Sequence, residues 1–125
     1  MKKVEDSNVR QNTKIKDLLA EYKKSGGFVT KKIADGADIL REMMKTCDIN
    51  ILSFPSCIIS TGTRGIIKDL VKNKKFNMVM TTCGTLDHDF ARSHADYYHG
   101  SFEADDVELH KRGIYRLGNL FIPVD

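Results

Sequence analysis

The fold of this chain is decided by one stretch, Asn50-Ile51-Leu52-Ser53-Phe54-Pro55-Ser56-Cys57-Ile58-Ile59-Ser60-Thr61-Gly62. Its first five residues are a short apolar run ended by a proline, which predicts a strand over residues 50–54. A loop of small hydroxyl residues then leads into a helix, predicted from the core spacing of Ile66, Ile67, Leu70 and Val71. A strand, a small-residue loop and a helix in this order are typical of an α/β fold.

The same order returns further along the chain. A second strand is predicted over residues 78–82, and Cys83-Gly84-Thr85 leads from it into a helix over residues 86–93. A further helix over residues 105–112 ends at Gly113, and a third strand is predicted over residues 117–122. Two helices, over residues 14–24 and 30–45, precede the first strand and are separated by Ser25-Gly26-Gly27. Strands that alternate with helices imply parallel pairing through right-handed crossovers.

The predicted sheet is incomplete in this chain, with about three strands present. A parallel sheet is covered on both faces and commonly has five or more strands. The chain ends at Pro123-Val124-Asp125, directly behind the third predicted strand and with no closing helix. We therefore expect further polypeptide to complete the sheet. The alternative is a small three-stranded domain covered entirely by its own helices.

Composition excludes several classes of protein. Lysine and arginine number 20 against 17 aspartates and glutamates, and a net charge of +3 is too small for a nucleic-acid binder that depends on phosphate contacts. No apolar run approaches the roughly 20 residues of a membrane helix, and the polar start lacks the apolar core of a signal peptide. Residues 1–13 are predicted to form an N-terminal arm ahead of one domain over residues 14–125, in a cytoplasmic protein.

The two loops behind the strands are the first candidate site. Ligands of open α/β sheets bind beyond the carboxyl ends of the strands. Small residues and free backbone N–H groups at a helix N-terminus favour an anion or phosphate cradle. A plain turn with hydroxyl helix caps explains the same residues equally well. Cys57 and Cys83 lie in these loops, where they are expected to be buried small residues rather than nucleophiles.

Asp87-His88-Asp89 is the densest ionisable cluster, at the start of the helix behind the second loop. Its carboxylates either cap that helix or form a charged wall for a cationic amine. A metal site is not predicted, because the spacings of 5, 6 and 5 between Cys83, His88, His94 and His99 match no compact ligand motif. The aromatic cluster over residues 97–102 is expected to pack in a core or turn, since acidic neighbours exclude nucleic-acid stacking there.

These segments together resemble deoxyhypusine synthase, and the archaeal-type branch more than the eukaryotic one. The resemblance covers nearly everything after residue 14. It is carried by Ser25-Gly26-Gly27-Phe28, the loop over residues 56–62, Thr81-Thr82-Cys83-Gly84-Thr85-Leu86-Asp87-His88-Asp89, Tyr97-Tyr98-His99-Gly100-Ser101-Phe102, Asp105-Asp106-Val107-Glu108-Leu109 and the stretch over residues 113–123.

The resemblance implies a transferase that uses NAD to oxidise spermidine and moves its aminobutyl group onto a lysine of the hypusine-containing translation factor. It also implies Rossmann-like subunits in a tetramer, with active sites formed between paired subunits. The family's NAD-binding segments fall on Ser56, Cys57, Ile58, Ile59 and Ser60 and on Thr82, Cys83 and Gly84. An acidic pair that holds the polyamine, and partly the cofactor, falls on Asp87 and His88.

Two departures from the family follow. His88 stands in place of the second acid and supplies less negative charge for a polycation, which leaves a related reaction such as that of homospermidine synthase open. Family members are much longer, and their imine-forming lysine lies in the part absent here. Lys68, Lys72, Lys74 and Lys75 are interpreted as solvated cations at the end of a helix. No catalytic residue is therefore predicted in this chain, which is expected to be inactive alone and to assemble with a chain or segment that supplies the lysine. The alternative is a non-catalytic regulatory or structural subunit.

Overall fold

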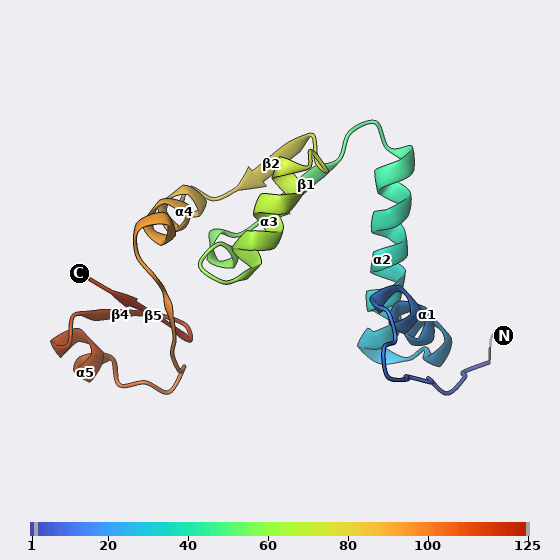
Figure 1. Ribbon diagram of the computed structural model, residues 1–125, viewed down its shortest axis with the longest axis horizontal. Helices are drawn as coiled ribbons and strands as arrows, with labels where there is room; N and C mark the ends of the chain where they lie inside the picture. Colours follow the sequence, from blue (N-terminus) through green and yellow to red (C-terminus); the bar gives the residue numbers. More distant parts are fainter. Residues whose placement is uncertain (2, 125) are drawn as a thin grey trace. The chain divides into compact units, whose positions relative to one another are not determined.

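The computed structural model describes residue 1 and residues 3–124, and it divides into two compact units, Met1–Asn50 and Ile51–Asp125. Figure 1 labels most of the elements of both units. The predicted arm and domain, residues 1–13 and 14–125, include positions 2 and 125, which lie outside the described residues. We describe each unit by itself.

The first unit is a helical hairpin of α1 (Ile15–Ser25) and α2 (Phe28–Thr46). Gly26 and Gly27 join the helices with φ of +62° and +72°, values that suit glycine, so the predicted turn is confirmed. Helix α2 begins two residues before its predicted start. The N-terminal segment lies along α1, where the Glu5 N–H donates to the Lys24 carbonyl at 3.2 Å and the Asn8 N–H donates to Glu21 Oε2 at 2.9 Å.

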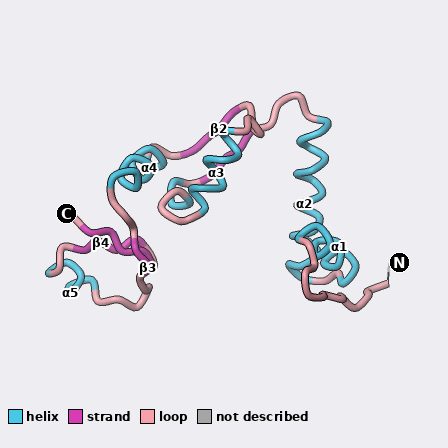
Figure 2. The backbone as a smooth tube through the Cα atoms, viewed as in Figure 1, coloured by secondary structure: helices cyan, strands magenta, loops and turns pink. Residues whose placement is uncertain are grey.

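The second unit opens with the predicted strand–loop–helix repeat. Strand β1 (Ile51–Phe54) pairs in parallel with β2 (Met78–Thr81), as the sequence predicts. A 3₁₀ turn, η1 (Ser56–Ile58), and helix α3 (Thr63–Lys72) connect the two strands, and α4 (Gly84–His94) follows β2. Figure 2 separates these strands from the helices by colour.

The prediction of a third parallel strand over residues 117–122 is wrong. The segment is instead an antiparallel hairpin of β4 (Ile114–Leu117) and β5 (Leu120–Pro123). Gly118 has a φ of +61° and begins a two-residue turn, and a glycine at that position lets the chain reverse between the strands. Strand β3 (Tyr98–His99), from the predicted aromatic cluster, pairs with the other side of β5.

Helix α5 (Asp106–Lys111) precedes the hairpin, and its start confirms the sequence prediction. The Asp105 carboxylate accepts hydrogen bonds from the N–H groups of Val107 and Glu108 and so caps the helix. The described chain is thus a mixed α/β structure with a two-stranded parallel sheet and a separate three-stranded antiparallel sheet.

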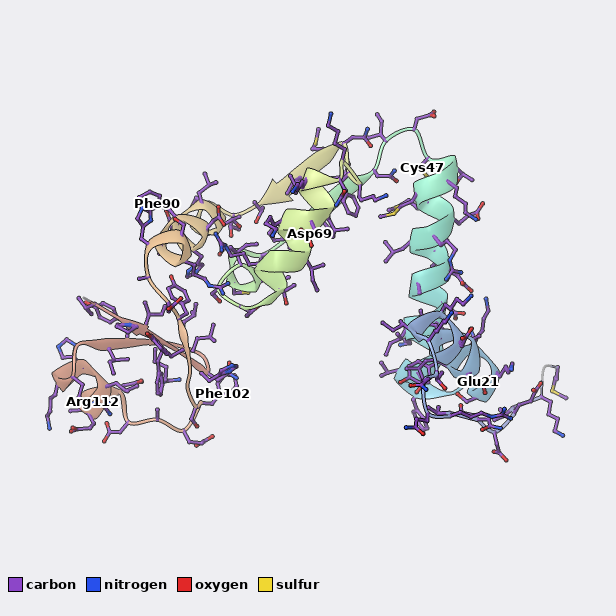
Figure 3. All side chains as sticks on the ribbon, viewed as in Figure 1. Glu21, Cys47, Asp69, Phe90, Phe102 and Arg112 are labelled. Carbon is purple, nitrogen blue, oxygen red and sulfur yellow. The ribbon has the colours of Figure 1, made fainter. Side chains whose placement is uncertain are left out.

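The parallel pair has one bare apolar face. Paired residues of parallel strands share a face, so Phe54 and Thr81 lie on one side and Ile51, Met78 and Met80 on the other. Phe54 is buried, whereas Ile51, Met78 and Met80 are 49%, 52% and 55% exposed. Exposed aromatic residues occur elsewhere in this unit, among them Phe90 and Phe102 (Figure 3). A parallel sheet normally has both faces covered, so the exposed face of β1 and β2 has room for further polypeptide to pack on it.

Candidate functional site

The two predicted cofactor loops lie side by side at the carboxyl ends of β1 and β2. The Ser56 N–H donates to Thr82 Oγ1 at 3.1 Å, which links the first loop directly to the second. At the last residues of the two strands, the Thr81 hydroxyl of β2 donates to the Phe54 carbonyl of β1 at 2.8 Å. Parallel pairing explains this contact, because it brings both carboxyl ends to the same edge of the sheet.

Gly84 allows the loops to approach closely. A Cβ atom at this position would lie 2.9 Å from Ser56 Oγ and 3.2 Å from Ser56 Cβ, closer than ordinary packing permits. Any larger residue at position 84 would therefore push the loops apart. Glycine is needed here for space rather than for an unusual backbone angle.

Four N–H groups of the predicted cradle are bonded within the two turns. The N–H groups of Ile58 and Ile59 donate within the 3₁₀ turn, to the carbonyls of Pro55 and Ser56. In the second loop, Thr85 and Leu86 donate to the carbonyls of Thr82 and Cys83. Tight turns take up these four donors, so they are not available to a ligand.

The remaining predicted loop residues divide by burial. Ile59 and Ser60 are only 3% and 2% exposed, and the Ser60 hydroxyl donates to the Cys57 carbonyl at 2.6 Å. Both residues therefore shape the loop from within. Cys57 and Cys83 are exposed free cysteines, one on each loop, so the expectation that they are buried is wrong.

An open hollow of about 470 Å³ lies at these strand ends. Ser53, Phe54, Pro55, Met80, Thr81 and Thr82 line it. Thr82 is the predicted cofactor residue that borders this hollow. Thr82 thus both makes the hydrogen bond that links the two loops and lines the open hollow beside them.

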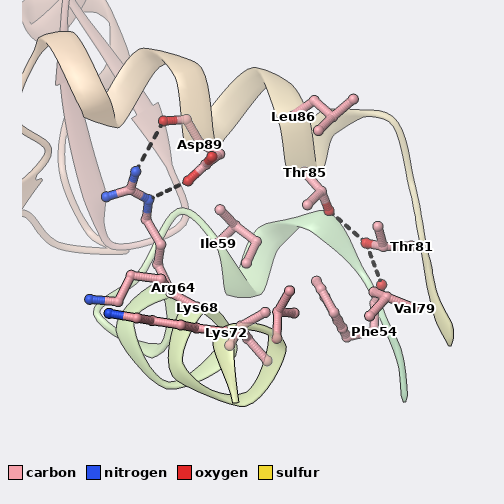
Figure 4. Close-up of a pocket in the computed structure, with 12 residues that line it drawn as sticks. Phe54, Ile59, Arg64, Lys68, Lys72, Val79, Thr81, Thr85, Leu86 and Asp89 are labelled. Atoms are coloured by element: carbon pink, nitrogen blue, oxygen red, sulfur yellow. Dashed lines mark hydrogen bonds and ion pairs between the residues drawn. The ribbon is translucent and has the colours of Figure 1, made fainter. Parts of the chain in front are cut away.

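A larger cavity, of about 620 Å³, is bounded by α3, α4 and the covered face of the parallel sheet (Figure 4). Its lining includes apolar side chains such as Phe54, Ile67 and Val79, and Arg64 and Asp89 form an ion pair at 2.7 Å beside it. Of the predicted site residues, Ile59 alone lines it. We therefore interpret this cavity as incompletely filled packing space between helices and sheet. It adjoins the smaller hollow, because Phe54 and Thr81 line both.

The predicted amine-binding residues both lie on α4, but they differ in burial and in their contacts. Asp87 is exposed, whereas His88 is half-buried and its Nδ1 lies 3.1 Å from the Tyr97 hydroxyl. The two rings meet edge to face at 5.9 Å between centroids. Asp89 pairs with Arg64 and is thereby tied to α3. The structure thus adds Tyr97 to the site.

Arg92 is a second residue that sequence reasoning missed. It lies one helical turn beyond His88, and its Nη1 donates to the carbonyls of Ile59, at 2.8 Å, and Thr61. The i, i+4 spacing predicts that Arg92 and His88 share a face of α4. It does not predict the loop conformation that places the carbonyls of Ile59 and Thr61 beside Arg92.

In the part of the chain that the structure describes, no three His, Cys, Asp or Glu side chains are placed to hold a metal ion. Across residue 1 and residues 3–124, no helix has the length and apolar character needed to cross a membrane.

Comparison with known proteins places these observations in a family context. A family model described as deoxyhypusine synthase matches residues 17–125. A probable deoxyhypusine synthase of Picrophilus torridus is 49% identical over 120 residues, which are 96% of this chain and 39% of that relative. The corresponding protein of Thermoplasma acidophilum is 43% identical with the same coverage, and that of Aeropyrum pernix is 40% identical over 100% of this chain and 41% of its own length. The chain thus spans about two fifths of the relatives it matches.

Proposed function

The chain belongs to the deoxyhypusine synthase family, and from this premise we propose that it supplies the NAD-binding loops and part of the polyamine site of such an enzyme. The reaction would oxidise spermidine and transfer its aminobutyl group to a lysine of the hypusine-containing translation factor. The observation that carries this proposal is the direct contact between the two loops, made by the Ser56–Thr82 hydrogen bond and the close approach at Gly84.

The loops suit a dinucleotide in position and chemistry. They meet beyond the carboxyl ends of parallel strands, beside an open hollow, and they present hydroxyl groups that bond well to ribose and phosphate oxygens. When bound, NAD accepts hydride and so supplies the oxidising chemistry. The residues proposed to hold it are Ser56, Cys57, Ile58, Ile59, Ser60, Thr82, Cys83 and Gly84, with His88 at the border of the amine site.

Asp87 and His88 are proposed to face the polyamine. The exposed Asp87 carboxylate would pair with an ammonium group of spermidine or a related polyamine. His88, which contacts the Tyr97 hydroxyl, would direct the amine mainly by hydrogen bonding, because an imidazole ring supplies no negative charge.

A second polypeptide segment is part of the proposal. The bare face of β1 and β2 and the coverage of only two fifths of the relatives support a larger assembly that completes the sheet and brings the imine-forming lysine. We propose that residues 14–125 form the cofactor-binding part of this homo- or hetero-oligomer, with residues 1–13 as its arm. Its protein substrate works in translation, which supports a cytoplasmic location.

Co-expression tests this function. The chain is produced with a second polypeptide that comprises the part of the Picrophilus torridus relative outside the match, and deoxyhypusine formation on the translation factor is followed by mass spectrometry. We expect NAD-dependent product only when both polypeptides are present. An assembled pair that makes no product, with the intact relative active under the same conditions, would contradict the proposal.

A further inference from the structure

The first loop is held from outside by one side chain. The guanidinium of Arg92, on α4, donates from a single nitrogen to the carbonyls of Ile59 and Thr61. These carbonyls flank Ser60, the most deeply buried polar residue of the loop. Hydrogen bonds from a charged donor are stronger than those between neutral groups, so this contact fixes the end of the loop.

Arg92 is itself oriented by its neighbours. Its Cζ atom lies 5.8 Å from the centroid of the Tyr97 ring, within the range of a cation–π contact. The Tyr97 hydroxyl in turn contacts His88 Nδ1. The guanidinium thus stands between the candidate cofactor loop and the residues of the candidate amine site.

We propose that Arg92 is a positioning residue that holds residues 56–61 in the conformation in which Ser56 meets Thr82. Without it, the carbonyls of Ile59 and Thr61 would lose their charged partner. The loop would then sample other conformations, and the contact at Gly84 would loosen. The consequence for NAD affinity rests on the proposed function, whereas the consequence for loop order does not.

The test compares four full-length variants with the unmodified chain. Arg92→Met removes the donors and keeps an apolar stem of similar length, and Arg92→Lys restores a cationic donor. Arg64→Met is the matched control, because the Arg64 side chain also ties α4 to a neighbouring element, through Asp89. The Arg64 backbone N–H donates to the Thr61 carbonyl, and the substitution leaves that hydrogen bond in place. Tyr97→Phe keeps the ring beside Arg92 and removes the hydroxyl that contacts His88.

The first readout is amide hydrogen exchange of peptides that cover residues 56–61, relative to peptides from residues 98–123 of the same molecule. We expect Arg92→Met to speed exchange at Ile58, Ile59 and Thr61 about tenfold or more, and Arg92→Lys to recover part of the protection. Arg64→Met and Tyr97→Phe should leave loop exchange within about twofold of the unmodified chain. Equal acceleration in both peptide sets, unchanged loop exchange in Arg92→Met, or the same local loss in Arg64→Met would overturn the proposal.

The second readout is NADH binding, followed by its fluorescence in the two-polypeptide assembly described above. A rise in Kd of about tenfold in Arg92→Met, partly reversed in Arg92→Lys and absent in Arg64→Met, is expected. An assembly of the unmodified chain that does not bind NADH would count against the proposed function, while the exchange data would still decide the role of Arg92. Unchanged affinity in Arg92→Met despite a disordered loop would contradict the link between loop order and cofactor binding.

Discussion

Single contacts determine how closely the two candidate cofactor loops approach one another. Ser56 provides both a backbone donor for Thr82 and the surface against which Gly84 packs. A change of one methyl group at this point is therefore expected to affect both loops. Ser56, Thr82 and Gly84 were predicted as cofactor residues from the resemblance, but their mutual contact required the parallel register of the strands to be known.

Gly84→Ala tests that contact. The added methyl would lie 2.9 Å from Ser56 Oγ, so the loops must separate, at a cost of about 1–3 kcal/mol in unfolding free energy. Urea unfolding followed by circular dichroism measures the change. Gly62→Ala is the control, because a Cβ at Gly62 meets nothing within 4 Å and its φ of −61° suits alanine. Equal stability of the two variants would show that the loops do not pack as described.

The pKa of Asp106 is lowered, because Arg116 donates to its carboxylate through both Nε and Nη2. A carboxyl whose pKa is lowered on folding stabilises the folded state at pH values above its pKa in the unfolded chain, about 3.9. This stabilisation is lost as the pH falls through the pKa that the carboxyl has in the folded state. We expect Asp106→Asn to be less stable than the unmodified chain at pH 7. The difference should shrink as the pH falls below about 4.

Thermal unfolding between pH 2.5 and pH 7 measures this difference. Asp96→Asn, at an exposed position outside the contact between α5 and the hairpin, is the control. A stability gap for Asp106→Asn that stayed constant down to pH 2.5 would rule out ionisation of this carboxyl as its cause.

At the scale of elements, the antiparallel sheet depends on one close contact between strands. A Cβ atom at Gly100, directly behind β3, would lie 2.4 Å from ring atoms of Phe121 on β5. Gly100→Ala should therefore disturb the β3–β5 pairing and cost about 1–3 kcal/mol. Adding Phe121→Leu should recover part of this loss, because it removes the ring. A double-mutant cycle by urea unfolding measures the coupling, and additive effects would contradict the contact.

The sequence predicted helices and strands well where capping residues and apolar runs determine them. It predicted them poorly where a tight turn reverses the chain. Asp105 and Gly113 mark the ends of α5 in sequence and in structure, and the apolar runs of β1 and β2 lie within their predicted strands. The hairpin was missed because Gly118-Asn119 interrupts an apolar run that otherwise has the length of one strand. The tight turns of the loops likewise use four N–H groups that composition alone left free, those of Ile58, Ile59, Thr85 and Leu86.

At the scale of the whole molecule, the described chain has a small buried core. Within residue 1 and residues 3–124, the buried apolar residues are Ala34, Phe54, Ile59 and Leu109, while apolar residues of β2 stay exposed. The family model confirms the resemblance seen in the sequence. The chain spans about two fifths of the length of its relatives, which agrees with the expectation that family members are much longer.

Assembly is tested by mass. Native mass spectrometry of the chain with the complementary polypeptide should give one complex that resolves into both chains under denaturing conditions. Thermal unfolding of the complex should occur at a higher temperature than that of the 14.1 kDa chain alone, because binding would cover the face formed by Ile51, Met78 and Met80. Met80→Asp, which places a charge on that face, should weaken assembly, while Lys72→Asp on α3 should not. Equal effects of the two substitutions would exclude this face as the contact.

The central claim, that the two loops form the NAD site, is tested most directly by photolabelling the assembly with an azido analogue of NAD and mapping the modified peptides. We expect label on peptides that contain Ser56–Ser60 or Thr82–Gly84, with protection by excess NAD. Protected label confined to the helical hairpin of α1 and α2 or to the β3–β5–β4 sheet, or no protected label on this chain, would contradict it.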